Sequence, residues 1–233
     1  MRSVLFILFI TVSFASFSAD VKTVIEKMQS VYASKDMSYS ATYRLYKGHS
    51  STKVHSSYNG KIISQGENLY QKIKNTEFIY TSDFFLKISH EEKILAVDLP
   101  QKNNQLQVDV SAALKQCASK TIKEVNGDYI IELTLNNSAQ LQCSKIVLKI
   151  ASDNYVLKQL EIYYTYFEDF STSYSTKDLH QPKLSIEFSS IVFNPTVDKK
   201  IFDLSKYVSN RNGSLSPTAA YTGYELIDYR LKR

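Results

Sequence analysis

Between residues 38 and 193 the chain repeatedly alternates apolar and polar residues with a period of two. This period is typical of a strand with one buried face, because successive side chains of a strand point to opposite sides. The pattern covers residues 38–47, 53–64, 68–74, 77–81, 84–89, 93–99, 120–126, 129–135, 142–150, 155–167 and 183–193. Most connections are too short for a crossover helix, so neighbouring strands are expected to pair antiparallel. The sequence therefore predicts a single β-rich domain with a sheet of about ten or eleven strands.

Composition agrees with this fold class. The chain has 17 Tyr and 12 Phe, and aromatic side chains suit half-buried pleated surfaces. Six Gly and four Pro are too few for a collagen-like chain or a flexible linker. The net charge of +5 is mild, and lysines alternate with acidic residues, so no basic stripe of the kind that binds nucleic acid is present.

Two segments have the helical period instead. In residues 20–34, apolar residues recur at helical spacing behind Asp20, a good N-cap. In residues 109–118, Asp109 is the expected cap, and Val110, Ala113, Leu114 and Cys117 form the inward stripe. We expect both helices to pack on the sheet.

The two ends of the chain differ from the middle. Residues 1–18 combine Arg2 with an apolar run that is too short to span a bilayer, followed by small residues, as in a secretory signal peptide. Cleavage after Ala15 and cleavage after Ser18 fit equally well. Residues 19–208 then form the domain. Residues 209–233 are a C-terminal extension, in which 210–214 has loop composition and 222–231 is either an edge strand or a flexible tail.

The chain has two cysteines, Cys117 and Cys143, and export would place them in an oxidising compartment. In an oxidising compartment the expected state of a single pair is one disulfide. The alternative is two separate buried thiols.

Motifs for catalysis and metal binding are absent from the sequence. The four histidines are His49, His55, His90 and His180. They are scattered, with no H-E-x-x-H or Cys-x-x-Cys spacing, and there is no G-x-S-x-G elbow or Gly-rich phosphate loop. The acidic pairs Glu91–Glu92 and Glu168–Asp169 are neighbours in sequence, and such neighbours point to opposite faces of a strand. We therefore expect no enzymatic activity, no metal and no cofactor.

The apolar face of the predicted sheet is wider than the two predicted helices can cover. A helix of 15 residues is about 22 Å long, whereas ten strands span about 48 Å. The sheet is therefore expected to coil into an unclosed, half β-barrel with a helical lid, an α+β fold that is mainly β. The residues expected to line its interior are Leu69, Ile73, Phe84, Leu86, Ile88, Leu160, Ile162, Tyr164, Ile186 and Phe188. They either fill a solid core or line an apolar cavity for a hydrophobic ligand.

The order of these features resembles the periplasmic outer-membrane lipoprotein carrier family, the LolA-like proteins. The resemblance covers about residues 20–208 and is one of pattern. The stretches that carry it are Val24-Ile25-Glu26-Lys27-Met28, Tyr39-Ser40-Ala41-Thr42-Tyr43, Tyr58-Asn59-Gly60-Lys61-Ile62, Asn68-Leu69-Tyr70-Gln71-Lys72, Ile79-Tyr80-Thr81-Ser82-Asp83, Lys93-Ile94-Leu95-Ala96-Val97, Phe188 to Phe193 with Asn194-Pro195, and Lys200-Ile201-Phe202-Asp203-Leu204. Where the family typically carries an Arg-Pro pair tied to lid control, this chain reads Gln65-Gly66.

This resemblance implies a cavity for acyl chains and no enzymatic activity. The leading hypothesis is a soluble, monomeric periplasmic carrier with no membrane anchor. It would bind acyl chains of lipoproteins or lipids and shuttle them toward the outer membrane, acting as a transport chaperone that exchanges its cargo with inner- and outer-membrane partners. The alternative is an envelope-sensing or regulatory binding module on the same scaffold.

Overall fold

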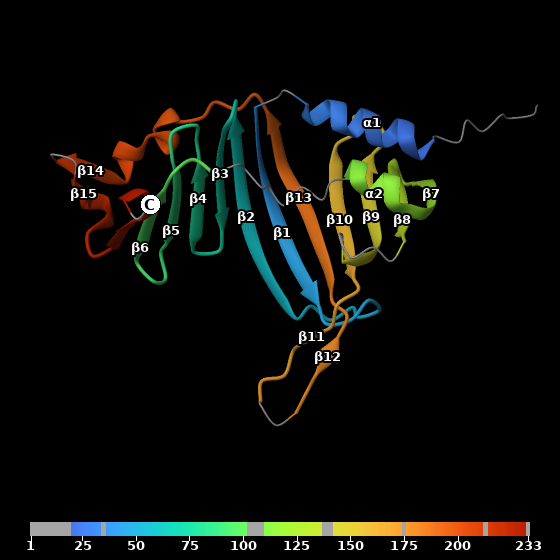
Figure 1. Ribbon diagram of the computed structural model, residues 1–233. Coiled ribbons are helices and arrows are strands. Elements are labelled where there is room, and N and C mark those ends of the chain that lie inside the picture. The colour runs from blue at the N-terminus through green and yellow to red at the C-terminus, as the bar shows by residue number, and fades with distance from the viewer. Residues whose placement is uncertain are drawn as a thin grey trace, which may run out of the picture.

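The structure is a computed structural model that describes residues 20–33, 36–101, 110–136, 142–173, 176–211 and 214–231. Its centre is one sheet of twelve strands in the order β16-β6-β5-β4-β3-β2-β1-β13-β10-β9-β8-β7. The sheet is curved and not closed into a barrel, and few helices accompany it (Figure 1), so the predicted half-barrel is confirmed. The expected signal peptide, residues 1–18, lies outside the described residues.

The strands match the predicted segments closely. They are β1 Met37–Tyr46, β2 Ser56–Gln65, β3 Asn68–Ile73, β4 Thr76–Tyr80, β5 Phe85–Ser89, β6 Ile94–Asp98, β7 Cys117–Val125, β8 Asp128–Leu135, β9 Cys143–Ala151, β10 Leu157–Tyr164 and β13 Lys183–Phe193. Between β10 and β13 lies the small hairpin β11 Glu168–Asp169 with β12 Leu179–His180. Asn126 and Gly127 join β7 to β8 with positive φ angles of 52° and 77°, as a tight hairpin turn requires.

Both predicted helices are present. Helix α1 (Val21–Tyr32) begins at Asp20, whose carboxylate accepts a hydrogen bond from the Thr23 backbone N–H at 3.2 Å. Helix α2 (Val110–Gln116) is shorter than expected, because Cys117 already belongs to β7, and its expected cap, Asp109, lies outside the described residues. Both helices lie over the β7–β10 half of the sheet (Figure 1).

The C-terminal residues are part of the fold. After β13 the chain forms short 3-10 helices at Lys199–Phe202, Leu204–Lys206, Ala219–Tyr221 and Tyr229–Leu231. The hairpin β14 Val208–Arg211 with β15 Ser214–Pro217 replaces most of the loop expected at 210–214, because its residues pair with one another. Strand β16 (Glu225–Asp228) is the edge strand, and it pairs parallel to β6.

The sheet packs two cores on its opposite faces. Face membership follows from the register, because directly paired residues point to the same side. One core lies under α1 and α2 and includes Ile146 and Leu148. The other lies on the reverse side of β2–β6, where Ile79, Leu86 and Leu95 pack against residues of the C-terminal segment. We call the side under the helices the helix face and the other the reverse face.

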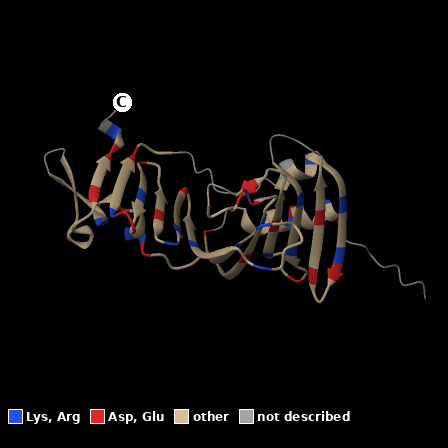
Figure 2. Ribbon diagram, turned by 90° about the horizontal axis from the view of Figure 1, so that it is seen from below, with Lys and Arg blue, Asp and Glu red and all other residues tan. Residues whose placement is uncertain are grey.

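Charges of both signs occur along the same strands (Figure 2). Among the described residues no helix has the length and hydrophobicity to cross a membrane.

Candidate functional site

The structure divides the ten predicted cavity residues between the two faces. Leu69, Leu160, Ile162 and Ile186 are buried in the helix-face core, and Tyr164 and Phe188 pack against it. Ile73 lies on the same face, since it pairs with Gly60 two residues from Ile62.

Phe84, Leu86 and Ile88 belong instead to the reverse-face core, so the prediction of one common cavity was wrong for them. The period of two predicts which residues of one strand share a face. It does not predict how each turn aligns the next strand. Here the C-terminal segment covers the reverse face of β5, and that strand therefore turns its most apolar side chains away from the helices.

An aromatic belt crosses the part of the helix face that neither α1 nor α2 covers. It consists of Tyr39, Tyr43, Tyr58, Phe78, Tyr80, Phe85 and Phe188. Tyr43 and Tyr58 stack with ring centroids 4.8 Å apart, and Tyr80 lies 4.9 Å from Phe85. Burial raises the pKa of the Tyr58 and Tyr80 phenols, so the belt is neutral at physiological pH. Apart from Tyr43, its members are only half-buried, and they offer apolar area to a ligand.

Gly60 leaves space for the Tyr43 ring of this belt. Gly60 sits inside β2, within the predicted strand segment 53–64, and is paired with Ala41. A Cβ atom at Gly60 would lie 3.0 Å from Cε2 of Tyr43 and 3.3 Å from the Lys72 carbonyl oxygen. The missing side chain therefore lets the Tyr43 ring approach the backbone closely.

Charged residues avoid the helix face of the central strands. The helix-face positions of β13, β1, β2, β3 and β4 are occupied by Leu184, Ile186, Phe188, Tyr39, Ala41, Tyr43, Leu45, Tyr58, Gly60, Ile62, Ser64, Leu69, Gln71, Ile73, Thr76, Phe78 and Tyr80. The reverse face of the same strands carries the ion pairs Arg44–Glu187, at 2.5 Å, and Lys72–Glu77, at 3.2 Å. The strand positions of the helix face are thus all uncharged; a charge close to the belt is Lys74, in the turn after β3, whose Nζ lies 5.1 Å from the Tyr58 ring centroid.

A hollow of about 280 Å³ continues this surface at the sheet edge. Its lining is Phe85, Lys87, Ser89, Glu92, Ile94, Ala96, Asp98, Gln101, Ile227 and Tyr229. Phe85 also belongs to the aromatic belt, where its ring stacks with Phe78 at 6.5 Å. The sequence analysis missed this hollow, because β16 was only one of two alternatives for the C-terminal residues.

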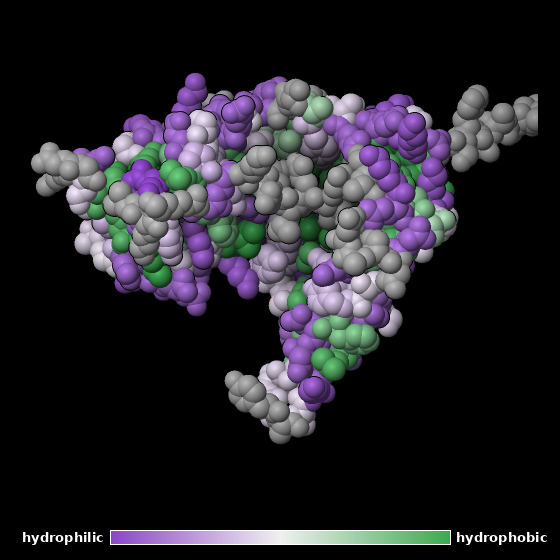
Figure 3. All heavy atoms as spheres, in the orientation of Figure 1, coloured by the Kyte–Doolittle hydropathy of each residue, from purple (hydrophilic) through white to green (hydrophobic). Residues whose placement is uncertain are grey.

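The hairpin β11–β12 projects beyond the end of the sheet and carries hydrophobic side chains (Figures 1 and 3). Phe167 is 65% exposed, Leu179 48% and Tyr166 39%, which places them among the most exposed large hydrophobic residues described. Isolated exposed apolar residues are ordinary, but a group on one projecting element is typical of a contact site.

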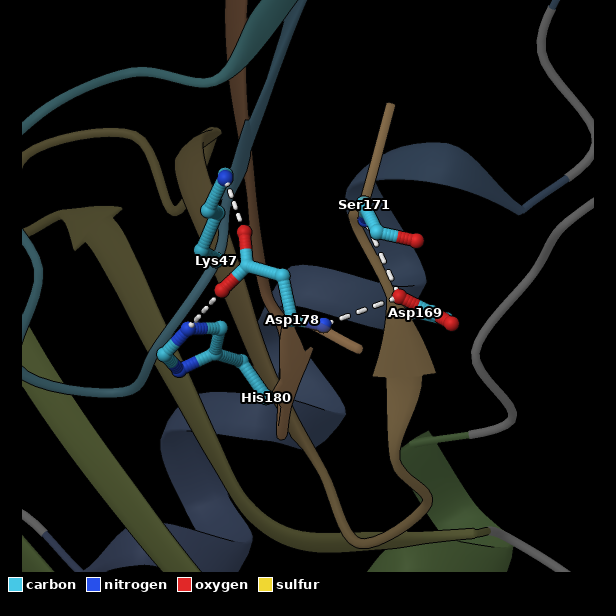
Figure 4. Close-up of polar contacts among 5 residues, drawn as sticks. All are labelled: Lys47, Asp169, Ser171, Asp178 and His180. Atoms are coloured by element: carbon cyan, nitrogen blue, oxygen red, sulfur yellow. Dashed lines mark hydrogen bonds and ion pairs between the residues drawn. The ribbon is translucent and has the colours of Figure 1, made fainter. Parts of the chain in front are cut away.

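Polar contacts fasten this hairpin to the turn after β1 (Figure 4). The Asp178 carboxylate forms an ion pair with Lys47 and accepts a hydrogen bond from His180 Nε2 at 2.7 Å. Lys47 and then His180 hold the pKa of Asp178 below its usual value. Asp169 accepts hydrogen bonds from the backbone N–H groups of Ser171 and Asp178. The Lys47–Asp178 ion pair therefore joins the hairpin to the turn after β1, and the other contacts lie within the hairpin.

A second polar cluster lies on the reverse face. Glu77 Oε1 accepts hydrogen bonds from Lys72 Nζ at 3.2 Å and His90 Nε2 at 2.8 Å, and His90 Nδ1 lies 2.8 Å from the Tyr224 hydroxyl. Burial opposes ionisation of Glu77, but the bonds from His90 and Lys72 outweigh it and lower its pKa. The cluster joins the C-terminal segment to the sheet.

The predicted disulfide is not formed: Cys117 and Cys143 are free thiols. They begin β7 and β9, and β8 lies between these strands. Two strand spacings amount to roughly 10 Å, whereas a disulfide needs Cα atoms within about 7 Å. The alternative of two separate thiols describes the structure, and burial raises the pKa of the Cys143 thiol.

Within the described ranges, no three His, Cys, Asp or Glu side chains gather in a way that could hold a metal ion. The surfaces described are an apolar face and small polar clusters on an open, curved sheet.

Comparison with known proteins gives structural similarity only. No family model and no curated protein matches the chain. A LolA superfamily protein from Nitrosomonas europaea is 11% identical, with 79% of this chain and 98% of that chain covered and a TM-score of 0.34. A DUF1329 family protein from Desulfovibrio piger is 14% identical, with 78% and 95% covered and a TM-score of 0.37. The Mycobacterium tuberculosis lipoprotein LppX is 12% identical, with 76% and 96% covered and a TM-score of 0.44.

Proposed function

We propose that this protein is a non-enzymatic carrier that binds an acyl chain of a lipid or lipoprotein on the helix face of its sheet. The observation that supports this proposal is the separation of charge. Over five central strands the helix face carries only uncharged side chains, while the reverse face of the same strands carries Arg44, Lys61, Lys72, Glu77 and Glu187. A surface kept free of charge and left half-exposed suits a hydrocarbon ligand.

The energetics fit reversible carriage. Each buried CH₂ group contributes about 0.8 kcal/mol, so covering part of one acyl chain is enough for micromolar binding. The belt tyrosines stay neutral, and their rings are already fixed by stacking, so little side-chain entropy is lost on binding. Because the sheet is open, the ligand can leave without unfolding of the protein.

We further propose that the carrier works in the periplasm and moves its cargo toward the outer membrane. The signal-peptide pattern of residues 1–18 supports export. The division into residues 19–208 and an extension, 209–233, remains a prediction. The mass of the chain from the periplasmic fraction will give the cleavage point: a chain that begins near residue 16 or 19 is expected, and an intact Met1 would contradict export.

A carboxylate placed in the uncharged strip tests the carrier proposal. Ile73 is half-buried on the helix face, so Ile73→Glu puts a charge where the acyl chain would lie. Ser57→Glu is the matched control, since Ser57 is exposed on the reverse face opposite Arg44. Binding of a fluorescent long-chain fatty acid is expected to weaken at least about tenfold in Ile73→Glu, or 1.4 kcal/mol, and to stay unchanged in Ser57→Glu.

Circular dichroism of both variants shows whether the fold is kept. Wild-type protein that co-purifies with no lipid and takes up no fatty-acid probe would contradict the carrier proposal.

The projecting hairpin favours a second candidate function, a sensing or regulatory module that docks on a membrane partner. Phe167 and Leu179 would be the contact residues. If this function holds, cross-linking in the cell envelope captures one integral membrane protein with wild type and loses it with Phe167→Ser and Leu179→Ser combined. Capture of many lipoproteins instead, unaffected by the hairpin variant, favours the carrier.

A further inference from the structure

The hollow at the sheet edge has an apolar floor and charged side chains around it. Its floor comes from three adjacent strands on the helix face, where register places Lys87 beside Ala96 and Ala96 beside Ile227. Ile94 and Phe85 extend the apolar floor on either side of this row. Since β16 supplies Ile227, the hollow exists only because the C-terminal segment adds a strand to the sheet.

The charged residues of the hollow are two acids and one base: Asp98, Glu92 and Lys87. Among the described residues, Lys87 and the Glu92 carboxylate make no ion pair. Asp98 accepts hydrogen bonds from the Leu99 backbone N–H at 2.7 Å and from Gln101 Nε2 at 3.1 Å, which fix the orientation of its carboxylate. Asp98 lies directly opposite Phe85, and Lys87 is two residues from Phe85 along β5. Lys87 and Asp98 are therefore diagonal neighbours on the same face, at residue positions about 7–8 Å apart.

We propose that this hollow is the head-group site for a zwitterionic phospholipid with an ammonium and a phosphate, whose acyl chain lies on the aromatic belt. The proposal rests on the carrier function and names the ligand class of that surface. Lys87 pairs with the phosphate and Asp98 receives the ammonium, while Glu92, in the turn before β6, lies at the other end of the hollow. Phe85 links the two parts, because it lines the hollow and belongs to the belt.

Size and charge both favour this ligand class. A hollow of about 280 Å³ lies at the lower limit for a small-molecule site; it suits a head group and leaves the chains outside. Two carboxylates against one ammonium give the hollow a negative balance, which opposes anionic lipids and accepts a group that carries its own positive charge.

Short-chain lipids used as monomers in solution test the proposal. Dihexanoyl-phosphatidylethanolamine is expected to bind at least about tenfold more tightly than dihexanoyl-phosphatidylglycerol, equivalent to 1.4 kcal/mol. Free phosphoethanolamine, which has the same charged groups without chains, is expected to bind at least about a hundredfold more weakly than the lipid, because it gains no apolar burial. Equal binding of the two phospholipids overturns the proposal, and equal binding of phosphoethanolamine overturns the lipid assignment.

Two variants test which residues contact the lipid head group. Asp98→Asn removes the negative charge, and Lys87→Met removes the positive charge while it keeps the apolar stem. Each is expected to reduce phosphatidylethanolamine binding about tenfold. Lys61→Met, at an exposed position on the reverse face, is the control.

If fatty acid binds and the variants do not change lipid preference, the head-group site is wrong and the carrier proposal stands. If neither lipid nor fatty acid binds to wild type, both are wrong.

Discussion

Phe85 and Leu86 are neighbours in β5, and their side chains lie on opposite faces of the sheet. Leu86 is fully buried in the reverse-face core, whereas Phe85 is half-buried in the aromatic belt. The same change at the two positions should therefore separate stability from binding.

We predict that Leu86→Ala lowers the free energy of unfolding by about 2–5 kcal/mol, since it opens a cavity in a packed core. Phe85→Ala is expected to cost less stability and to weaken fatty-acid binding, because its ring contributes to the ligand surface. Urea unfolding and a fluorescent fatty-acid titration of both variants check this. Equal loss of stability in the two variants, with fatty-acid binding of the folded protein unchanged, would contradict the assignment of faces.

Glu77 provides a prediction that depends on pH. Its carboxylate is largely buried and accepts hydrogen bonds from His90 and Lys72, which lower its pKa despite burial. A lowered pKa stabilises the fold above the unfolded value of about 4.3, and this stabilisation is lost as the pH falls through the folded value. Glu77→Gln should therefore reduce the free energy of unfolding by about 1–2 kcal/mol at pH 7 and by less at pH 3. A difference that grows as the pH falls would contradict this sign.

At the scale of elements, the projecting hairpin β11–β12 is held by a few contacts at its base. Asp178 connects Lys47 on one side with His180 on the other, and its pKa is lowered by Lys47 first and His180 second. We predict that Asp178→Asn increases amide hydrogen exchange in residues 168–180 and leaves exchange in β8 and β9 unchanged. Asp203→Asn, which removes a cap in the C-terminal segment, is the control. Unchanged exchange in the hairpin would show that other contacts hold it.

Most elements were predictable because their signals are local. The period of two placed eleven strands, and Asp20 and the Asn126-Gly127 turn have the roles that their side chains and positive φ angles indicate. The reason for a glycine at position 60 was not predictable, because the close approach of Tyr43 is a tertiary contact that no local pattern records.

The candidate site was only partly predictable for the same reason. Leu69, Leu160, Ile162 and Ile186 share a face as expected. Leu86 does not, because the segment that covers it lies more than 100 residues later in the chain. The edge hollow depends on β16, whose parallel pairing with β6 is likewise a long-range contact.

At the scale of the whole molecule, one sheet joins two cores. Leu148 is fully buried in the core under α1 and α2, and Leu95 is fully buried in the core on the reverse face. Among the described residues the two cores have no hydrophobic member in common, but the hydrogen-bonded register is continuous through β3, β2, β1 and β13 between them. Loss of either core removes the support of one half of this sheet and exposes the edge of the other half.

We therefore predict that Leu95→Ala and Leu148→Ala each destabilise the protein by about 2–5 kcal/mol and shift the same unfolding transition. Tyrosine fluorescence and circular dichroism, followed together during urea unfolding, should give coincident midpoints for wild type and for both variants. The energies of the double variant should add, because the two sites are far apart. Two separate transitions in either single variant would show instead that the halves unfold independently, and the continuous register would then not be enough to couple them.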